Sequence, residues 1–194
     1  MTNSERKASD FVDETRLWQN HMELANFGAT ALGGVNRQAL SNEEIDARKQ
    51  LFKWAEELNL KPLRDDAGNL FFRKEGINPD LAPVMTGSHI DSQPTRGKFD
   101  GAYGVLAGFE AIQALSEAGI KTKRTIEIAV WMNEEGSRFA PGMMGSEAFS
   151  GIRPLEKILT VKDNAGISVG DDLKTVLAAT PSAESVAVRR PVFA

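Results

Sequence analysis

The chain has 194 residues, of which 41% are hydrophobic and 26% are charged, which is typical of a globular protein with room for one real core. Its net charge of −4 argues against a nucleic-acid surface, because phosphate binding requires a basic face. The lack of cysteine excludes disulfides and thiolate metal sites and favours a reducing cytoplasm. We expect no membrane span and no secretory signal, because no run of 18 apolar residues exists and residues 1–20 are polar and charged.

The first predicted element is a helix over residues 5–27. Its apolar side chains recur at helical spacing and share one face. They are Phe11, Trp18, Met22 and Ala25. His21 lies in this helix, and without an acidic partner nearby in sequence we interpret it as a solvated or hydrogen-bonded histidine rather than a ligand or a base.

A second helix and a hairpin follow. Ser41 begins a capping-box pattern that predicts a helix to about Leu58. Residues 61–63 and 69–73 predict two short strands, joined by the turn composition of residues 65–68.

The middle of the chain predicts a βαβ unit. Residues 81–87 form an apolar run that we interpret as a buried parallel strand. Residues 101–118 show helical periodicity, and residues 125–132 predict a second strand. A strand, a crossover helix and a strand form a right-handed parallel unit. We therefore predict an α/β fold, a partial α/β/α sandwich with a mostly parallel sheet.

The remaining segment is predicted to be rich in loops. Residues 136–151 are expected to wrap over the site described next. A short helix is expected at 173–179, and strands at 185–188 and 191–193.

Polar side chains gather where the two strands of the βαβ unit end. His89 follows the first strand, Glu134 and Glu135 follow the second, and Asp100 directly precedes the crossover helix. In such sheets, ligands collect outside the carboxyl ends of parallel strands, so these side chains are expected to converge. Imidazole and carboxylate ligands suit a pair of divalent metal ions where no thiol is present.

Each residue of this cluster has a plausible chemical role. His89 can give one ring nitrogen to a metal while Asp91 accepts the proton of the other nitrogen. Asp100 can bridge two cations with its two oxygens. Glu134 and Glu135 are adjacent, so in an extended segment they point to different sides, and one can bind metal while the other acts as a general base. A water held between two cations has a lowered pKa and attacks a carbonyl once a carboxylate takes its proton.

Simpler interpretations stay open for two of these positions. Asp100 before Gly101 has the pattern of a helix N-cap, and a cap and a ligand are not exclusive. A pair of glutamates is usually solvated surface charge. Here the pair follows an apolar strand directly, which makes full exposure less expected.

Three motifs resemble the hydantoinase/carbamoylase family of amidohydrolases, which belongs to the aminoacylase-type metallopeptidase clan. They are Thr86-Gly87-Ser88-His89-Ile90-Asp91-Ser92, Gly97-Lys98-Phe99-Asp100-Gly101-Ala102-Tyr103-Gly104-Val105 and Met132-Asn133-Glu134-Glu135-Gly136-Ser137-Arg138-Phe139. The resemblance covers about residues 10–194. That family includes N-carbamoyl-L-amino acid hydrolases, β-ureidopropionase-like enzymes and allantoate amidohydrolases, which release ammonia and carbon dioxide from a ureido group.

The resemblance implies a role for each cluster residue. His89, Asp100 and Glu135 match metal ligands, with Asp100 bridging two Zn, Mn, Co or Ni ions. Glu134 matches the general base, and Asp91 matches the carboxylate that orients the histidine. No residue is assigned to substrate binding.

The chain departs from the family pattern in its length. Family members are much longer, so residues 1–194 are expected to form the N-terminal part of the catalytic domain. The lid and dimerisation domain, through which full-length relatives are expected to form homodimers, and the C-terminal part of the catalytic domain would be absent. A His-Ile-Glu-Gln-Gly-like segment would follow the strand at 191–194. Arg96 also stands where many relatives have glycine.

We therefore expect a cytoplasmic metal-dependent hydrolase of a linear amide or ureido C–N bond, present as a weakly active or inactive fragment. Its substrate would be a small molecule: an N-carbamoyl-L-amino acid, N-carbamoyl-β-alanine or allantoate. An aminoacylase or aminopeptidase is the alternative within the enzyme class. A non-catalytic remnant that associates through an uncovered apolar sheet face is the alternative outside it.

Overall fold

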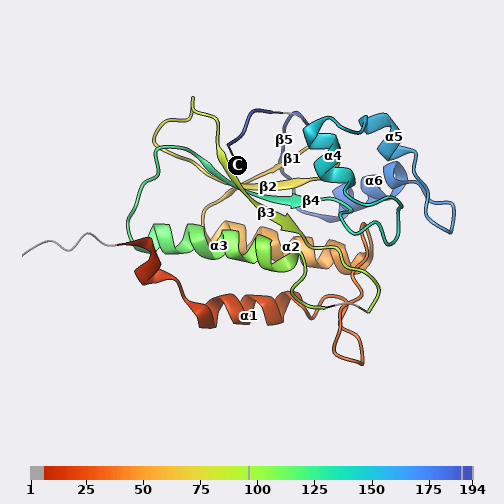
Figure 1. The fold of residues 1–194 in the computed structure, drawn as a ribbon, viewed down its shortest axis with the longest axis horizontal. Helices are drawn as coiled ribbons and strands as arrows, with labels where there is room; N and C mark the ends of the chain where they lie inside the picture. Colours follow the sequence, from red (N-terminus) through yellow and green to blue (C-terminus); the bar gives the residue numbers. More distant parts are fainter. Residues whose placement is uncertain (1–6, 96, 189, 194) are drawn as a thin grey trace, which may run out of the picture.

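A central sheet with helices on both faces forms the computed structural model, which describes residues 7–95, 97–188 and 190–193 (Figure 1). The strand order is β3-β4-β2-β1-β5. The strands are β1 Lys61–Arg64, β2 Leu70–Lys74, β3 Val84–His89, β4 Ile126–Trp131 and β5 Glu184–Ser185. The helices are η1 Ala8–Phe11, α1 Glu14–Leu24, α2 Asn42–Glu57, α3 Ala102–Glu117, α4 Met144–Ser150, α5 Leu155–Leu159 and α6 Val169–Ala179.

The predicted βαβ unit is confirmed. β3 and β4 are parallel neighbours, with His89 opposite Trp131, and α3 connects them. β1 and β5 are also parallel, whereas β2 runs antiparallel to both β1 and β4 because a tight turn joins it to β1. The α/β class is thus confirmed, and the sheet is mixed around its parallel pairs.

Two apolar layers hold the sandwich together. On one face, Phe72 and Ile128 of the sheet pack with α2 and α3, and α1 lies outside α3 (Figure 1). On the other face, Phe71 and Ala129 pack with Phe149 of α4. Within the part of the chain that the structure describes, no helix has the length and apolar character needed to cross a bilayer.

The N-terminal helix is shorter than predicted. A 3-10 turn, η1, is separated from α1 by Val12 and Asp13, while residues 1–6 lie outside the described part. The helix begins anew because the Asp13 carboxylate accepts the N–H of Arg16, which satisfies a free donor of the first turn. The prediction that Trp18 lies on a shared buried face is wrong, because its exposed fraction is 55%.

β3 is an edge strand rather than a buried one. Val84 and Thr86 are exposed, because the only neighbours described for β3 are β4 and an isolated parallel bridge to Phe193. The strand also extends further than predicted, so His89 is its last residue. Hydrophobicity alone did not distinguish a central strand from this one.

Two helices in the C-terminal region were not predicted. α4 and α5 occur where the glycines and prolines indicated a loop. α6 begins earlier than predicted, at Val169, because the Ser168 side chain accepts the N–H of Asp171 and caps it. Of the strand expected at 185–188, only Ser185 belongs to a strand, the short β5.

A buried carboxylate anchors the C-terminal segment to the sheet. Glu127 on β4 is fully buried and accepts hydrogen bonds from Arg73 Nη2 at 2.6 Å and Arg190 Nη1 at 2.7 Å. The Arg190 guanidinium also lies 4.3 Å from the centre of the Phe71 ring. The two arginines offset the cost of burying this charge.

Arg190→Ala is therefore expected to lower the free energy of unfolding by about 2–3 kcal/mol, because it removes one of the two cations that pair with a buried charge. Lys49→Ala breaks an exposed ion pair with Asp46 and is expected to cost about 0.5 kcal/mol or less. Urea denaturation measures both values. Equal losses in the two variants would show that Glu127 does not need Arg190.

Candidate metal centre

The ends of β3 and β4 bring the predicted cluster together. His89 ends β3, and the turn after β4 carries Glu134 and Glu135 back toward it. Asp100 arrives from the segment before α3. One ligand atom from each of His89, Asp100 and Glu135 lies within 4.8 Å of the other two. The convergence inferred from strand order is thus present in the structure.

The ring of His89 is held on both sides by acidic residues. Its Nδ1 lies 3.0 Å from the backbone oxygen of Asp91 and 3.3 Å from the Asp91 carboxylate. Its Nε2 lies 3.3 Å from the carboxylate of Glu134. A carbonyl oxygen can only accept, so Nδ1 carries a proton and Nε2 is the nitrogen directed into the cluster.

The electrostatics of His89 follow from these neighbours. Burial lowers its pKa, but the hydrogen bond and charge of Asp91 and the charge of Glu134 outweigh burial and raise the pKa to about 9. The ring is therefore strongly basic and lies in a strongly negative environment, which also favours a bound cation.

Asp91 has a second role that the sequence did not reveal. Its buried carboxylate accepts the backbone N–H of Glu134 at 3.2 Å and that of Glu135 at 3.1 Å. One side chain after β3 thus fixes the backbone of the turn after β4. Two charge-assisted bonds to backbone donors make this link stronger than an ordinary turn contact.

Arg37 supports the same strand end from behind. This buried guanidinium donates from Nε to the carbonyl of Ile90 at 2.7 Å and from Nη1 to the carbonyls of Leu24 and Phe27. Burial lowers the pKa of Arg37 to about 10, against the charges of Glu44 and Asp91, which raise it. Nothing in the local sequence marked this arginine as part of the site.

The two glutamates lie in a turn and not in the extended segment that was expected. Asn133 before them has a φ of +50°, outside the extended range of a strand, and lies in the turn that ends β4. Burial raises the pKa of Glu134; His89 opposes this, while the charges of Asp91, Glu135 and Asp100 add to it. The side chain of Glu134 is 34% exposed, so a substrate or water can reach it.

Asp100 is not the cap of α3. The N-cap is Gly101, and no side chain caps this helix. Gly101 has a φ of +65°, and a Cβ placed there would lie 2.4 Å from Cε1 of His89. Glycine at this position lets the start of α3 approach the imidazole ring.

Further contacts hold the loop after Glu135 against the loop after β3. The hydroxyl of Ser137 donates to the carbonyl of Ser92 at 3.1 Å. Arg138 forms ion pairs with Asp163 and Asp172 beyond the site. Arg96, which departs from the family pattern, lies outside the described residues.

His21 does not match the expectation that it is solvated or hydrogen-bonded. It is neither solvated nor hydrogen-bonded: it is 3% exposed, and neither ring nitrogen has a partner among the described residues. Its ring stacks on Tyr103 at 5.7 Å and lies 5.4 Å from Phe99. Burial lowers its pKa. His21 thus packs behind the segment that carries Asp100.

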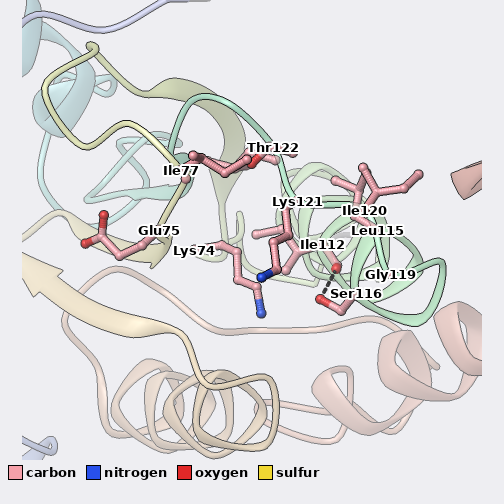
Figure 2. A pocket seen from close by; sticks show the side chains of 12 residues that line it. Lys74, Glu75, Ile77, Ile112, Leu115, Ser116, Gly119, Ile120, Lys121 and Thr122 are labelled. Carbon is pink, nitrogen blue, oxygen red and sulfur yellow. Dashed lines mark hydrogen bonds between the residues drawn. The ribbon is translucent and has the colours of Figure 1, made fainter.

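A separate cavity of about 480 Å³ lies at the opposite ends of α3 and β4. Its lining includes the apolar side chains of Ile112 and Leu115 and the side chains of Lys74 and Lys121 (Figure 2). Lysines near the C-terminal end of a helix such as α3 interact favourably with its dipole. Ile126 begins β4 here, whereas the metal-ligand candidates lie where that strand ends, so the cavity is not part of the candidate site.

Comparisons with known proteins agree with this fold. The family model of peptidase family M20/M25/M40 matches residues 85–182. An N-carbamoyl-L-amino-acid amidohydrolase of Rhizobium meliloti is 45% identical over 165 residues, which cover 85% of this chain and 40% of that protein. An allantoate amidohydrolase of Bacillus subtilis is 37% identical over 146 residues, which cover 75% of this chain and 35% of that protein. The crystal structure of a hydantoinase/carbamoylase family amidase from Burkholderia multivorans matches with a TM-score of 0.88 at 45% identity, covering 95% of this chain and 44% of that one.

The fold and the cluster define an α/β domain with acidic and imidazole side chains gathered at the carboxyl ends of parallel strands. The chain belongs to peptidase family M20/M25/M40. Its predicted resemblance to the hydantoinase/carbamoylase proteins within that clan is confirmed. The chain spans 35% to 40% of the length of the two curated relatives described above.

Gly101→Ala is expected to displace the ring of His89 and to lower the free energy of unfolding by about 1–3 kcal/mol more than Gly33→Ala. Gly33 is a matched control, because its φ is also positive, at +83°, but a Cβ there meets nothing within 4 Å. Denaturation gives the two losses. The chain has two histidines, so NMR can follow the ring signals of His89 directly. Equal losses with unchanged ring signals would contradict the close approach.

Proposed function

We propose that this chain is the metal-binding N-terminal part of the catalytic domain of an amidohydrolase that cleaves a linear ureido or amide C–N bond. The observation that carries the proposal is the meeting of His89, Asp100 and Glu135 ligand atoms within 4.8 Å, with Glu134 beside them. Its substrate class would be an N-carbamoyl-L-amino acid, or a related ureido acid such as N-carbamoyl-β-alanine or allantoate.

The side chains present suit a divalent cation. One imidazole nitrogen and two carboxylates form a mixed nitrogen and oxygen donor set, which accepts Zn, Mn, Co or Ni. We assign the metal ligands as His89, Asp100 and Glu135. Asp100, whose two oxygens can each face a cation, is the proposed bridge between two ions. When bound, such a cation polarises a carbonyl oxygen and lowers the pKa of a water molecule.

Glu134 is the proposed general base. Its carboxylate is partly exposed, stands 3.3 Å from Nε2 of His89 and has a raised pKa. A carboxylate whose pKa is closer to neutral can take a proton from water and later return it to the leaving nitrogen. Asp91 supports this step indirectly, because it fixes both the ring of His89 and the backbone N–H of Glu134.

The names of the relatives support the substrate class. An N-carbamoyl-L-amino-acid amidohydrolase and an allantoate amidohydrolase are both similar to this chain. Hydrolysis of a ureido group by this route would release ammonia and carbon dioxide. The absence of cysteine supports the proposal of a reducing cytoplasm as the place of action.

The chain covers less than half of the length of each relative described above, which supports the proposal that it is one part of a catalytic domain. In the longer protein, a lid and dimerisation domain and further metal ligands would complete the site, and homodimers would form through that domain. Three protein ligands for two ions leave both coordination spheres open, so this chain would bind metal weakly and turn over little.

An aminoacylase or aminopeptidase is the second candidate. The observation that favours it is the description of the matching family as a peptidase family. N-Carbamoyl amino acids, N-acetyl amino acids and dipeptides, compared at equal concentration with the same metal, separate the two reactions. Preferential release of ammonia from the carbamoyl compounds supports the first candidate, and preferential cleavage of the dipeptides or acetyl compounds overturns it.

Calorimetric titration with Zn²⁺ tests the proposed roles. His89→Ala, Asp100→Ala and Glu135→Ala are expected to weaken binding at least about tenfold, because each removes a ligand. Glu134→Gln is expected to retain Zn²⁺ binding, while any ammonia release by the wild type falls about 10²-fold or more because the base is lost.

The same titration can contradict the assignment in two ways. Unchanged Zn²⁺ affinity in His89→Ala and Asp100→Ala would remove the proposed ligands. Two tight Zn²⁺ sites on this chain would show that it does not need ligands from elsewhere.

A further inference from the structure

Gln93 reaches from the loop after β3 to the turn after β4. Its side-chain Nε2 donates to the backbone oxygen of Glu135 at 2.9 Å and to the Oε2 atom of the same glutamate at 3.0 Å. Both hydrogens of one amide nitrogen therefore serve one residue. The pair of bonds folds the Glu135 carboxylate back against its own backbone and restricts its rotamers.

We propose that Gln93 is a positioning residue that holds the Glu135 carboxylate ready for a divalent cation. This inference rests on the proposed function, because it takes Glu135 as a metal ligand. A ligand fixed before the cation arrives loses less conformational freedom on binding, so the cation binds more tightly. Hydrogen-bonding partners of metal ligands commonly act in this way.

The division of labour around Glu135 makes the role of Gln93 specific. Asp91 fixes the backbone of this glutamate by accepting its N–H at 3.1 Å. Among hydrogen bonds between described residues, the one that reaches the carboxylate comes from Gln93. Loss of Gln93 removes one bond to the Glu135 backbone as well, but Asp91 still holds that backbone, so the main effect should be to free the side chain.

The chemistry of an amide suits this task. Gln93 donates a hydrogen bond to the carboxylate without bringing a positive charge. A lysine or arginine in its place would neutralise Glu135 and repel an incoming cation. The bond involves Oε2, and a carboxylate keeps a second oxygen that can face a metal ion.

Gln38, in the segment before α2, provides a matched control that contacts the loop after Glu135. Its Nε2 donates to the hydroxyl of Ser137 at 3.3 Å, two residues beyond Glu135. It is also a glutamine, and its amide also contacts this loop, but it does not contact the carboxylate. Replacing it should disturb the loop to a similar degree without releasing the ligand.

The experiment measures Zn²⁺ affinity of the 194-residue chain by competition with a chromophoric chelator. Methionine matches the length of glutamine and removes the donor. Gln93→Met is expected to bind Zn²⁺ about 10- to 100-fold more weakly than the wild type. Gln38→Met is expected to stay within about threefold of it. The visible absorption of bound Co²⁺ should change in Gln93→Met only, because only there does the ligand arrangement change.

A double variant tests whether Gln93 acts through Glu135. In a Glu135→Ala background, Gln93→Met should have no further effect on Zn²⁺ affinity. A further tenfold loss there would overturn the inference. Thermal unfolding shows whether each variant is folded. If Gln93→Met is not folded, Gln93→Ser takes its place, because it removes the same amide with a smaller side chain.

The outcomes separate this inference from the proposed function. If His89→Ala loses Zn²⁺ affinity while Gln93→Met and Gln93→Ser stay within threefold of the wild type, the positioning role is wrong and the metal site stands. If His89→Ala binds Zn²⁺ as the wild type does, the proposed metal site itself is wrong.

Discussion

The candidate site depends on one buried carboxylate that joins two strand ends. Asp91 follows β3 and accepts the backbone N–H groups of Glu134 and Glu135 after β4. Its own backbone oxygen lies against the ring of His89. The parallel pairing of β3 and β4 brings these segments to the same edge of the sheet, and Asp91 fixes their relative positions. Without it, a histidine and two glutamates would be near one another but not oriented.

The same arrangement concentrates negative charge in a small volume. Four carboxylates surround one imidazole, and their mutual repulsion contributes to the raised pKa of Glu134. The imidazole, with its raised pKa, and the buried guanidinium of Arg37 offset part of this repulsion. A cation would relieve this repulsion on binding, so the charge of the cluster favours the divalent metal site that we propose.

Sequence order was enough to predict the parts of the fold that local rules govern. The βαβ unit around α3 and the cap of α2 at Ser41 follow from periodicity and capping chemistry. The convergence of His89, Asp100 and Glu135 follows from the rule that parallel strands present their carboxyl ends together. These inferences required no knowledge of which side chains lie next to one another.

What the sequence could not show depends on tertiary neighbours. The exposure of Val84 reflects the edge position of β3, which the apolar run does not encode. The contacts of Gln93 and Arg37 cross between separate loops, so neither residue has a local pattern that marks it. Asp100 showed a capping pattern, yet the N-cap of α3 is Gly101, where the ring of His89 leaves no room for a side chain.

An anomalous difference map at the zinc edge, from a crystal of this chain soaked in Zn²⁺, would show where the cation binds. We expect an anomalous peak about 2.0–2.1 Å from Nε2 of His89, with carboxylate oxygens of Asp100 and Glu135 at about 2.0–2.2 Å. A peak that lies away from these three side chains, with His89 still bound only to Asp91 and Glu134, would contradict it.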